Sequence, residues 1–150
     1  MEQRHGAYLV SDDPSRLDAV AVHAYLRRSY WSENIPLEVV QRALAGSLCI
    51  AAYTQENQQV GLLRVISDYA TYAYLCDVYV LEEHRRHGLS KAMLALTLSH
   101  PRLQGLRTWN LRTLDAHGLY AQFGFKPAEH PESFMMLRFP AVYRATPNVI

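Results

Sequence analysis

The sequence predicts an α/β protein in which a mixed sheet lies between helices on its two faces. Short runs of apolar and β-branched residues alternate with stretches whose apolar residues recur at helical spacing. Read from the N-terminus, these patterns give the order β-α-α-β-β-β-α-β-α-β. With 150 residues, 49% of them apolar, the chain can build one hydrophobic core, so we expect a single domain over residues 1–150.

The first third of the chain contains one predicted strand and two predicted helices. Residues 8–10 start the sheet. The pair Asp13-Pro14, a capping side chain followed by proline, predicts a helix over about residues 14–29. Pro36 opens a second helix, which Gly46 stops.

The rest of the chain supplies most of the predicted sheet. Two apolar runs flank a polar turn at residues 55–59 and predict an antiparallel hairpin. Later segments return to helical spacing, one closed by Pro101 and one stopped by Gly124. The predicted strands are 48–53, 60–66, 72–81, 107–112 and 133–139, and the helices begin at 89 and span 116–123. The core covers about residues 5–140, and the last ten residues are expected to form a loose tail.

Composition narrows the functional classes. Fifteen basic and fourteen acidic side chains give a net charge of +1, which argues against nucleic acid or an anionic membrane as partner. The longest apolar stretch, residues 43–53, is far shorter than the roughly 20 residues of a membrane-spanning helix. We therefore expect a cytoplasmic protein.

The metal-ligating residue types form no recognisable ligand set. Cys49 and Cys76 lie inside apolar runs, which favours buried, reduced thiols over a disulfide or a zinc site. Of the seven histidines, His84 and His87 are three residues apart in a turn and His117 stands alone. The sequence predicts no metal.

One candidate functional segment is a strand that runs through a basic turn into a helix, residues 78–91. Such a turn directs backbone N–H groups and the positive end of the helix dipole at one point, which suits a phosphate. The alternative is an ordinary turn with surface arginines and a glycine at positive φ. No P-loop and no glycine-rich dinucleotide motif is present.

Two motifs together resemble the GNAT family of acetyl-CoA-dependent N-acetyltransferases. Residues 85–90, Arg-Arg-His-Gly-Leu-Ser, match the family's R/Q-x-x-G-x-G/A loop, with Ser90 at a position that is usually glycine or alanine. Residues 113–125 match N-x-x-A-x-x-L-Y-x-x-x-G-F, with Thr113 in place of asparagine. The resemblance implies a mostly antiparallel sheet. It also implies transfer of an acetyl group from acetyl-CoA to a small-molecule or peptide amine, and a possible homodimer.

The resemblance also implies roles for individual residues. Tyr120 becomes the general acid that protonates the departing thiolate of coenzyme A; without the motif it would be read as a core aromatic. A phenol with a pKa near 10 loses only about 2 kcal/mol in giving its proton to a thiolate of pKa near 8.5. The predicted acetyl-CoA contacts are Val78, Tyr79, Val80, Arg85, Arg86, His87, Gly88, Leu89, Ser90, Lys91 and Thr113.

The sequence indicates less clearly which residues would bind and deprotonate the acceptor amine. An alkyl amine of pKa about 10.4 needs about 4.6 kcal/mol to lose its proton at pH 7, so a base or a water chain is expected. Asp77 and Glu33 are candidates for the base, and each has a structural alternative, as hydrogen-bond acceptor or as solvated loop charge. Trp31 is a candidate wall of the acceptor pocket or a core residue.

Two other functional classes remain open at this point. A sensor or regulatory protein with this fold would bind coenzyme A tightly without turnover. A structural or interaction protein with a vacant cleft would not bind it. The substitutions at Ser90 and Thr113 favour the first alternative, and the presence of Tyr120 and the basic turn counts against the second.

Overall fold

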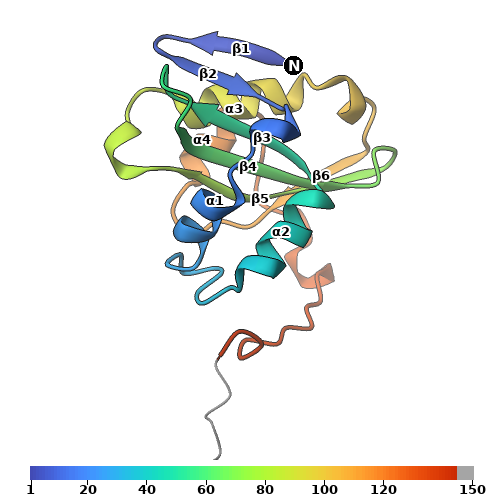
Figure 1. Ribbon diagram of the computed structural model, residues 1–150. Coiled ribbons are helices and arrows are strands. Elements are labelled where there is room, and N and C mark those ends of the chain that lie inside the picture. Colours follow the sequence, from blue (N-terminus) through green and yellow to red (C-terminus); the bar gives the residue numbers. More distant parts are fainter. Residues whose placement is uncertain (145–150) are drawn as a thin grey trace, which may run out of the picture.

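The computed structural model describes residues 1–144, which form one six-stranded sheet with helices on both faces (Figure 1). The strands lie in the order β1-β2-β3-β4-β5-β6. Neighbouring strands are antiparallel except β5 and β6, which are parallel. The strands are β1 (Glu2–His5), β2 (Tyr8–Ser11), β3 (Leu48–Tyr53), β4 (Gln59–Ser67), β5 (Tyr72–Val80) and β6 (Thr108–Leu111). The mixed, mostly antiparallel sheet expected from the sequence is confirmed.

Strand β3 shows why the centre of the sheet is apolar on both faces. All six of its residues are buried. Leu48, Ile50 and Ala52 belong to one hydrophobic cluster, whereas the intervening Cys49, Ala51 and Tyr53 belong to the other. Because successive side chains of a strand point to opposite faces, a strand covered on both sides must be apolar throughout.

The helices divide between these two faces. Helices α1 (Ala19–Leu26) and α2 (Leu37–Ala45) cover one face, where Val22 and Val40 are fully buried. Helix α3 (Leu89–Leu98) covers the other and contacts the five strands β1 to β5. The short helix α4 (His117–Ala121) lies on the same side as α3 and adds Tyr120 to that core.

The first helix is shorter than predicted and begins at a different aspartate. Asp13 caps only a 3₁₀ turn, Pro14–Arg16, after which Leu17 is extended. The helix begins after Asp18, whose carboxylate accepts hydrogen bonds from the N–H groups of Val20 and Ala21. The prediction of one helix over residues 14–29 was therefore wrong, because the chain is extended at Leu17 and the helix begins only after a second capping residue, Asp18.

Both chain ends also differ from the prediction. The N-terminal strand β1 was not foreseen, because its residues are polar and exposed and show no alternation. The strand predicted at 133–139 is absent: a 3₁₀ turn covers Pro131–Ser133, and an extended, exposed segment follows it. An extended segment becomes a strand only when a partner edge accepts its hydrogen bonds, and this one has no such partner among residues 1–144. Of the tail expected over the last ten residues, 145–150 lie outside the described part.

The pairing of β5 determines where the sheet opens. Strand β5 has nine residues, but only Tyr72 to Leu75 pair with β6, from Thr108 to Leu111. Beyond Leu75 the two strands separate, while β5 remains paired with β4 up to Val80. One edge of β5 is therefore free over residues 76–80.

No helix within residues 1–144 is long and apolar enough to cross a membrane.

Replacing Asp18 by alanine should lower the free energy of unfolding by about 1 kcal/mol, because two N–H groups at the start of α1 lose their acceptor. Urea denaturation measures the change. Asp13→Ala is the matched control and should cost less, since Asp13 caps only a three-residue turn. An equal or larger loss for Asp13→Ala would show that the helix depends on the earlier aspartate.

Candidate active site

A large cleft lies where β5 and β6 separate. It has a volume of about 1400 Å³. Strand β5 forms one wall, residues 112–120 form the opposite wall, and the turn before α3 closes one end. The loop after α1, with Tyr30 and Trp31, closes the other end.

A β-bulge shapes the β5 wall. Leu62 pairs with Tyr79 and Arg64 pairs with Cys76, so three steps on β5 oppose two steps on β4. Asp77, inside this bulge, has φ of 50°. A bulge leaves one residue out of the ladder and bends its strand, which here turns β5 away from β6 and exposes its edge to the cleft.

The closed end of the cleft is the N-terminus of α3. Gly88, the residue before the helix, has φ of 73°, a left-handed conformation that favours glycine. The first N–H groups of the helix, at Leu89, Ser90 and Lys91, have no helical acceptor, and no acidic side chain occupies the first turn. These groups and the helix dipole suit an anion bound in the cleft.

The N-terminal hairpin holds this turn in place. His5, on β1, donates a hydrogen bond from Nε2 to the carbonyl of His87 at 2.8 Å. The hydroxyl of Tyr8 and Nδ1 of His84 are hydrogen-bonded at 3.0 Å, and the Tyr8 ring packs against the rings of His84 and His87. A Cβ on Gly88 would lie 3.1 Å from Nε2 of His5. The sequence pattern did not find these supporting residues, which are about 80 positions from the turn.

Cations dominate the cleft lining. Its charged residues are Arg28, Arg85, Arg86, Lys91, Arg112 and Arg138 against Asp77 and Asp115. Arg85 is partly engaged: Nε donates to the carbonyl of Val80 at 3.1 Å. Arg28 pairs with Glu82 through two hydrogen bonds of 2.9 and 3.0 Å, and this contact with Arg28 lowers the pKa of Glu82 to about 2. The net positive lining favours an anionic ligand.

Tyr120 lies on the wall opposite β5. The residue is buried, with 8% of its surface exposed, and its ring packs edge-on against Phe125. Among residues 1–144 its hydroxyl has no side-chain hydrogen bond, so it is free to donate to a ligand in the cleft. Burial raises the pKa of Tyr120 to about 12, with a smaller contribution from Tyr30. The phenol therefore holds its proton throughout the physiological pH range.

Thr113 helps to position Tyr120. Its Oγ1 accepts a hydrogen bond of 3.0 Å from the N–H of Ala116, at the start of α4. The hydroxyl can still donate its own proton to a ligand, because a threonine oxygen both donates and accepts. Thr113 lines the cleft.

Aromatic rings form the wall at the other end. Tyr79 and Tyr25 stack with ring centroids 3.8 Å apart, and Tyr25 in turn lies near Trp31. Tyr30 packs edge-on against Trp31 at 4.9 Å. Trp31 and its neighbour Tyr30 both line the cleft, so Trp31 is part of its wall.

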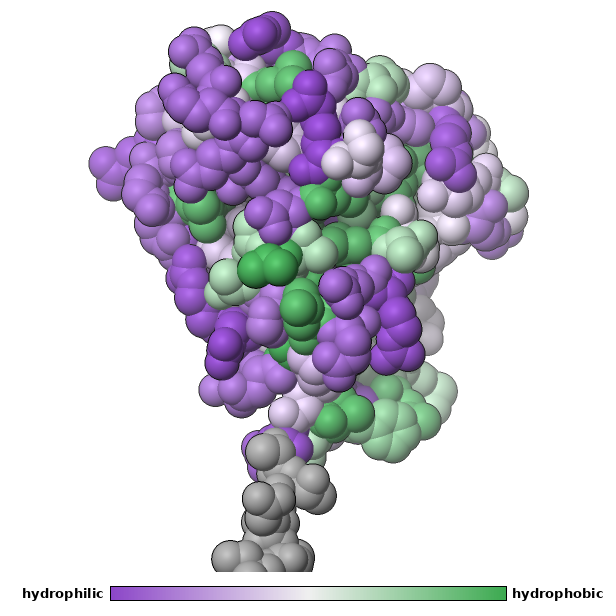
Figure 2. Space-filling view, viewed as in Figure 1, coloured by the Kyte–Doolittle hydropathy of each residue, from purple (hydrophilic) through white to green (hydrophobic). Residues whose placement is uncertain are grey.

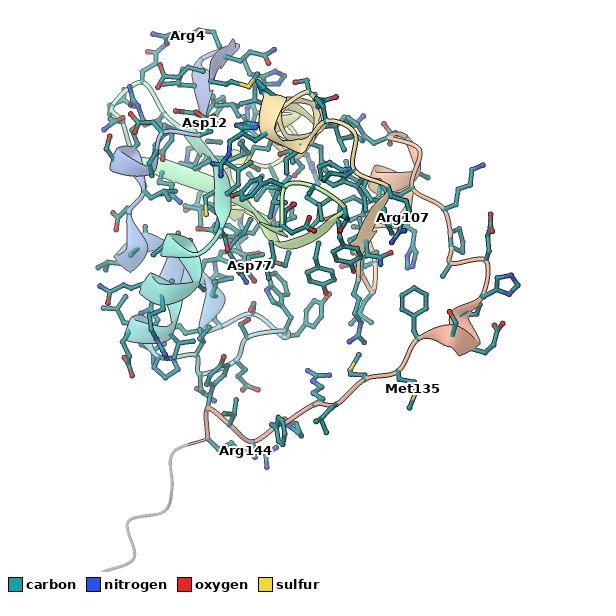
Figure 3. The ribbon with its side chains drawn as sticks, turned by 90° about the vertical axis from the view of Figure 1, so that its right-hand side faces the viewer. Arg4, Asp12, Asp77, Arg107, Met135 and Arg144 are labelled. Carbon is teal, nitrogen blue, oxygen red and sulfur yellow. The ribbon has the colours of Figure 1, made fainter. Side chains whose placement is uncertain are left out.

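Both carboxylate oxygens of Asp77 are engaged. Oδ1 accepts a hydrogen bond from Nε1 of Trp31 at 3.0 Å, and Oδ2 forms an ion pair with Nε of Arg64 at 2.7 Å. The two charged side chains are 8% and 14% exposed. Figure 3 shows Asp77 in the interior of the molecule. This geometry ties the bulge of β5 to β4 and to the loop after α1.

The structure brings most of the predicted site residues together. The cleft is lined by Trp31, Asp77, Val78, Tyr79, Val80, Arg85, Arg86, Gly88, Leu89, Ser90, Lys91, Thr113 and Tyr120. Two predicted residues are not in its lining. Glu33 is exposed outside it, and the His87 side chain turns back to donate from Nδ1 to the carbonyl of His84. Arg112, which lies outside both motifs, lines it as well, and so does Leu119, a motif position for which no ligand contact was predicted.

The thiols show no sign of nucleophilic activation. Burial raises the pKa of both Cys49 and Cys76 to about 12. A thiol of that pKa is almost entirely protonated near pH 7, and the thiolate is the nucleophile. Residues 1–144 also contain no group of three or more His, Cys, Asp or Glu side chains arranged to hold a metal ion.

Comparison with known proteins gives consistent matches. Residues 45–127, more than half of the chain, match the family profile described as "Acetyltransferase (GNAT) domain". A Gibberella zeae protein provisionally named as an acetyltransferase is 34% identical over 139 residues, 78% of this chain and 77% of that protein. A solved GNAT-family structure from Xanthomonas campestris pv. campestris, also provisionally named, is 48% identical with a TM-score of 0.88, covering 92% of this chain and 97% of that one. A Deinococcus radiodurans R1 structure with a provisional acetyltransferase name, 21% identical with a TM-score of 0.71 over 92% and 93% of the two chains, shows the same fold.

Replacing Gly88 by alanine should weaken coenzyme A binding by about tenfold. A left-handed conformation costs an alanine ~1–2 kcal/mol, and the new methyl group would press on His5. Calorimetric titration measures the affinity. Gly105→Ala is the matched control: Gly105 has φ of 77° but no atom within 4 Å of a new Cβ. A loss of affinity in the control alone would place the anion site elsewhere.

Replacing Asp77 by asparagine should lower the free energy of unfolding by about 3 kcal/mol, because Arg64 would lose its buried partner. Combining it with Arg64→Met should restore part of the stability. Chemical denaturation of both variants tests this. A fully stable Asp77→Asn variant that had lost turnover would instead identify Asp77 as the general base.

Proposed function

The chain belongs to the GNAT family of acetyltransferases, and on that premise we propose that it transfers the acetyl group of acetyl-CoA to a primary amine in this cleft. The observation that carries the proposal is that one free strand edge and one free phenol occur in the same cleft. Residues 76–80 of β5 lack a partner on the cleft side, and Tyr120 lines the same space. The enzyme therefore has places both for an extended acyl carrier and for an acid.

The residues present fit acetyl-CoA. The pantetheine arm carries amides, which can pair with the free edge at Val78 and Val80 as an added strand would. The diphosphate can be held by the N–H groups of Leu89 to Lys91, where Gly88 permits a close approach. Arg86 and Lys91 add positive charge at the rim. When bound, acetyl-CoA supplies the acetyl group as a thioester.

Tyr120 holds the proton that the departing sulfur needs. With a pKa of about 12, full transfer to a thiolate of pKa near 8.5 is uphill by about 5 kcal/mol. Donation of a hydrogen bond while negative charge develops on the sulfur avoids most of that cost. We therefore assign Tyr120 as hydrogen-bond donor in the transition state, with proton transfer completed as the sulfur leaves.

The acceptor amine loses its proton without a dedicated carboxylate in this proposal. Asp77 is engaged by Trp31 and Arg64, and Glu33 lies outside the cleft. Solvent at the open mouth therefore takes the proton. The β5 bulge leaves one residue between Cys76 and Tyr79 out of the β4–β5 ladder. The backbone N–H of that residue is a candidate hydrogen-bond donor to the thioester carbonyl. The tyrosines and Trp31 shape the acceptor pocket and exclude water from the amine.

Tyr120→Phe should lower kcat for acetyl transfer by about 100-fold and leave the Kd for coenzyme A unchanged, because only the transition-state donor is lost. The assay follows thiol release from acetyl-CoA with a panel of small amines and peptides. Tyr74→Phe is the matched control, since Tyr74 also lines the cleft and its pKa is also raised by burial.

Two results would contradict the assignment. One is a large loss of kcat in Tyr74→Phe with little loss in Tyr120→Phe. The other is a fall of kcat with an apparent pKa below 10. Tyr120 must be protonated to donate, so its contribution is lost only as pH rises toward about 12. Over pH 7 to 10 the rate should rise as the amine deprotonates. Binding of coenzyme A with no acceptor turned over would favour the sensor alternative.

A further inference from the structure

The cleft reaches both faces of the sheet. The turn before α3 lies on the face that α3 covers, and Leu75 and Leu111 pack in the hydrophobic cluster on that face. Because successive side chains along an extended chain point to opposite faces, the adjacent Tyr74 and Arg112 point to the face covered by α1 and α2. Both residues line the cleft, as does the loop after α1. The half of the cleft on this second face is called here the acceptor end.

Two guanidinium groups at the acceptor end have no acidic partner. Nη1 of Arg112 lies 3.4 Å from Sδ of Met136, and a thioether is only a weak acceptor. Arg138, two residues farther along the same segment as Met136, also lines the cleft. Among residues 1–144, neither arginine forms an ion pair. Their N–H donors are therefore available to a ligand.

The other cations of the cleft lining are engaged already or belong to the cofactor turn. Arg28 forms two hydrogen bonds with Glu82, and Arg85 lies 3.6 Å from the same carboxylate. Arg86 lies in the turn before α3, and Lys91 lies in the first turn of that helix. The two guanidinium groups at the acceptor end are thus left without a role in binding acetyl-CoA.

Carboxylates are scarce at the acceptor end. Two carboxylates among residues 1–144 line the cleft, those of Asp77 and Asp115. Asp77 is buried, and both of its oxygens are engaged, by Trp31 and Arg64. Asp115 is exposed and is the one carboxylate of this lining that remains available. One carboxylate against two guanidinium groups leaves a net positive charge, which attracts an anion and repels a polycation.

Apolar side chains surround these charges. Tyr30, Met136 and Leu137 line the cleft and are 59%, 59% and 83% exposed. Figure 2 shows hydrophobic surface at the lower end of the molecule, where the C-terminal segment runs. Exposed apolar groups gathered at the mouth of a cleft mark a place that a ligand covers. Once covered, charged contacts at this end are shielded from water and become stronger.

We infer that the acceptor is a primary amine that also carries a carboxylate or a phosphate group, which Arg112 and Arg138 bind. The inference rests on the proposed function and names its class of acceptor. Both kinds of anion present oxygens that match the guanidinium fork, so each can accept paired hydrogen bonds. In the reaction the acceptor nitrogen forms the new C–N bond as the C–S bond breaks. The nitrogen loses its proton to solvent, the sulfur receives the proton of Tyr120, and the anionic group remains in the product.

Calorimetric titration with matched pairs of amines tests this inference without turnover. L-phenylalanine is compared with L-phenylalaninamide, which lacks the carboxylate, and O-phosphoethanolamine is compared with ethanolamine, which lacks the phosphate. Each compound is titrated with and without saturating coenzyme A. The anionic member of at least one pair should bind about tenfold more tightly than its partner, and high salt should reduce this difference. The pair that shows the difference distinguishes a carboxylate from a phosphate.

Arginine variants assign the effect to the acceptor end. Arg112→Gln and Arg138→Gln should each weaken binding of the anionic amine by roughly tenfold, because a charge-assisted contact is lost, and leave the Kd of its partner compound unchanged. Both side chains are exposed, so the variants should fold. Arg107→Gln is the matched control, since Arg107 lies at the other end of β6, is exposed and does not line the cleft. It should retain the native affinity.

Several results would overturn the inference: equal binding within both pairs, no binding of either anionic amine, or an equal loss of affinity in Arg107→Gln. Tighter binding of spermidine, a polyamine, than of both anionic amines would do so as well. Acetyl-transfer assays with the same compounds separate this inference from the proposed function. Selective binding without transfer would support the anion site and contradict acetyl transfer. Transfer to all four amines without preference would support the proposed function and overturn the inference.

Discussion

The cleft depends on the early end of the parallel pairing between β5 and β6. Residues 73–75 of β5 have partners on both sides, whereas residues 76–80 have no partner on the β6 side. Continuous pairing would fill the space with backbone and leave no edge for a ligand. The bulge at Asp77 bends β5 where the two strands part, and the ion pair from Asp77 to Arg64 fixes that bend. The site thus exists because one strand is paired incompletely.

The turn into α3 illustrates how distant parts of the chain cooperate in this site. The anion-binding geometry comes from Gly88 and the first turn of the helix, but the carbonyl of His87 is held by His5. The polar hairpin at the N-terminus therefore supports the turn and protects one sheet edge. Across the cleft, Thr113 caps α4 and so fixes the helix that carries Tyr120. One wall is thus supported by a hydrogen bond from the N-terminal hairpin, and the other by a hydrogen bond between two of its own lining residues.

Local patterns predicted the elements, whereas the partners of those elements came only from the structure. The continuous apolar run in residues 48–53 and the helical spacing after residue 89 both result from burial, so the sequence alone indicates these elements. The choice between Asp13 and Asp18 as helix cap does not, because both are good caps. His5 was missed since a single polar residue carries no sign of a contact 82 positions away. Residues 133–139 have the composition of a strand, but a strand also needs a neighbouring edge to pair with. The sequence does not distinguish Asp77 from Glu33 as candidate bases, whereas the structure shows Asp77 in an ion pair with Arg64.

The most direct test of the cleft as an acetyl-CoA site is calorimetric titration with acetyl-CoA and, in parallel, with acetyl-pantetheine, which lacks the diphosphate. The account predicts micromolar or tighter binding of acetyl-CoA and at least tenfold weaker binding of acetyl-pantetheine, about 1.4 kcal/mol or more, because the N-terminus of α3 loses its anion. Equal affinity for the two compounds would remove the diphosphate from the turn at Gly88. No binding of either would leave the free edge of β5 without the ligand proposed for it.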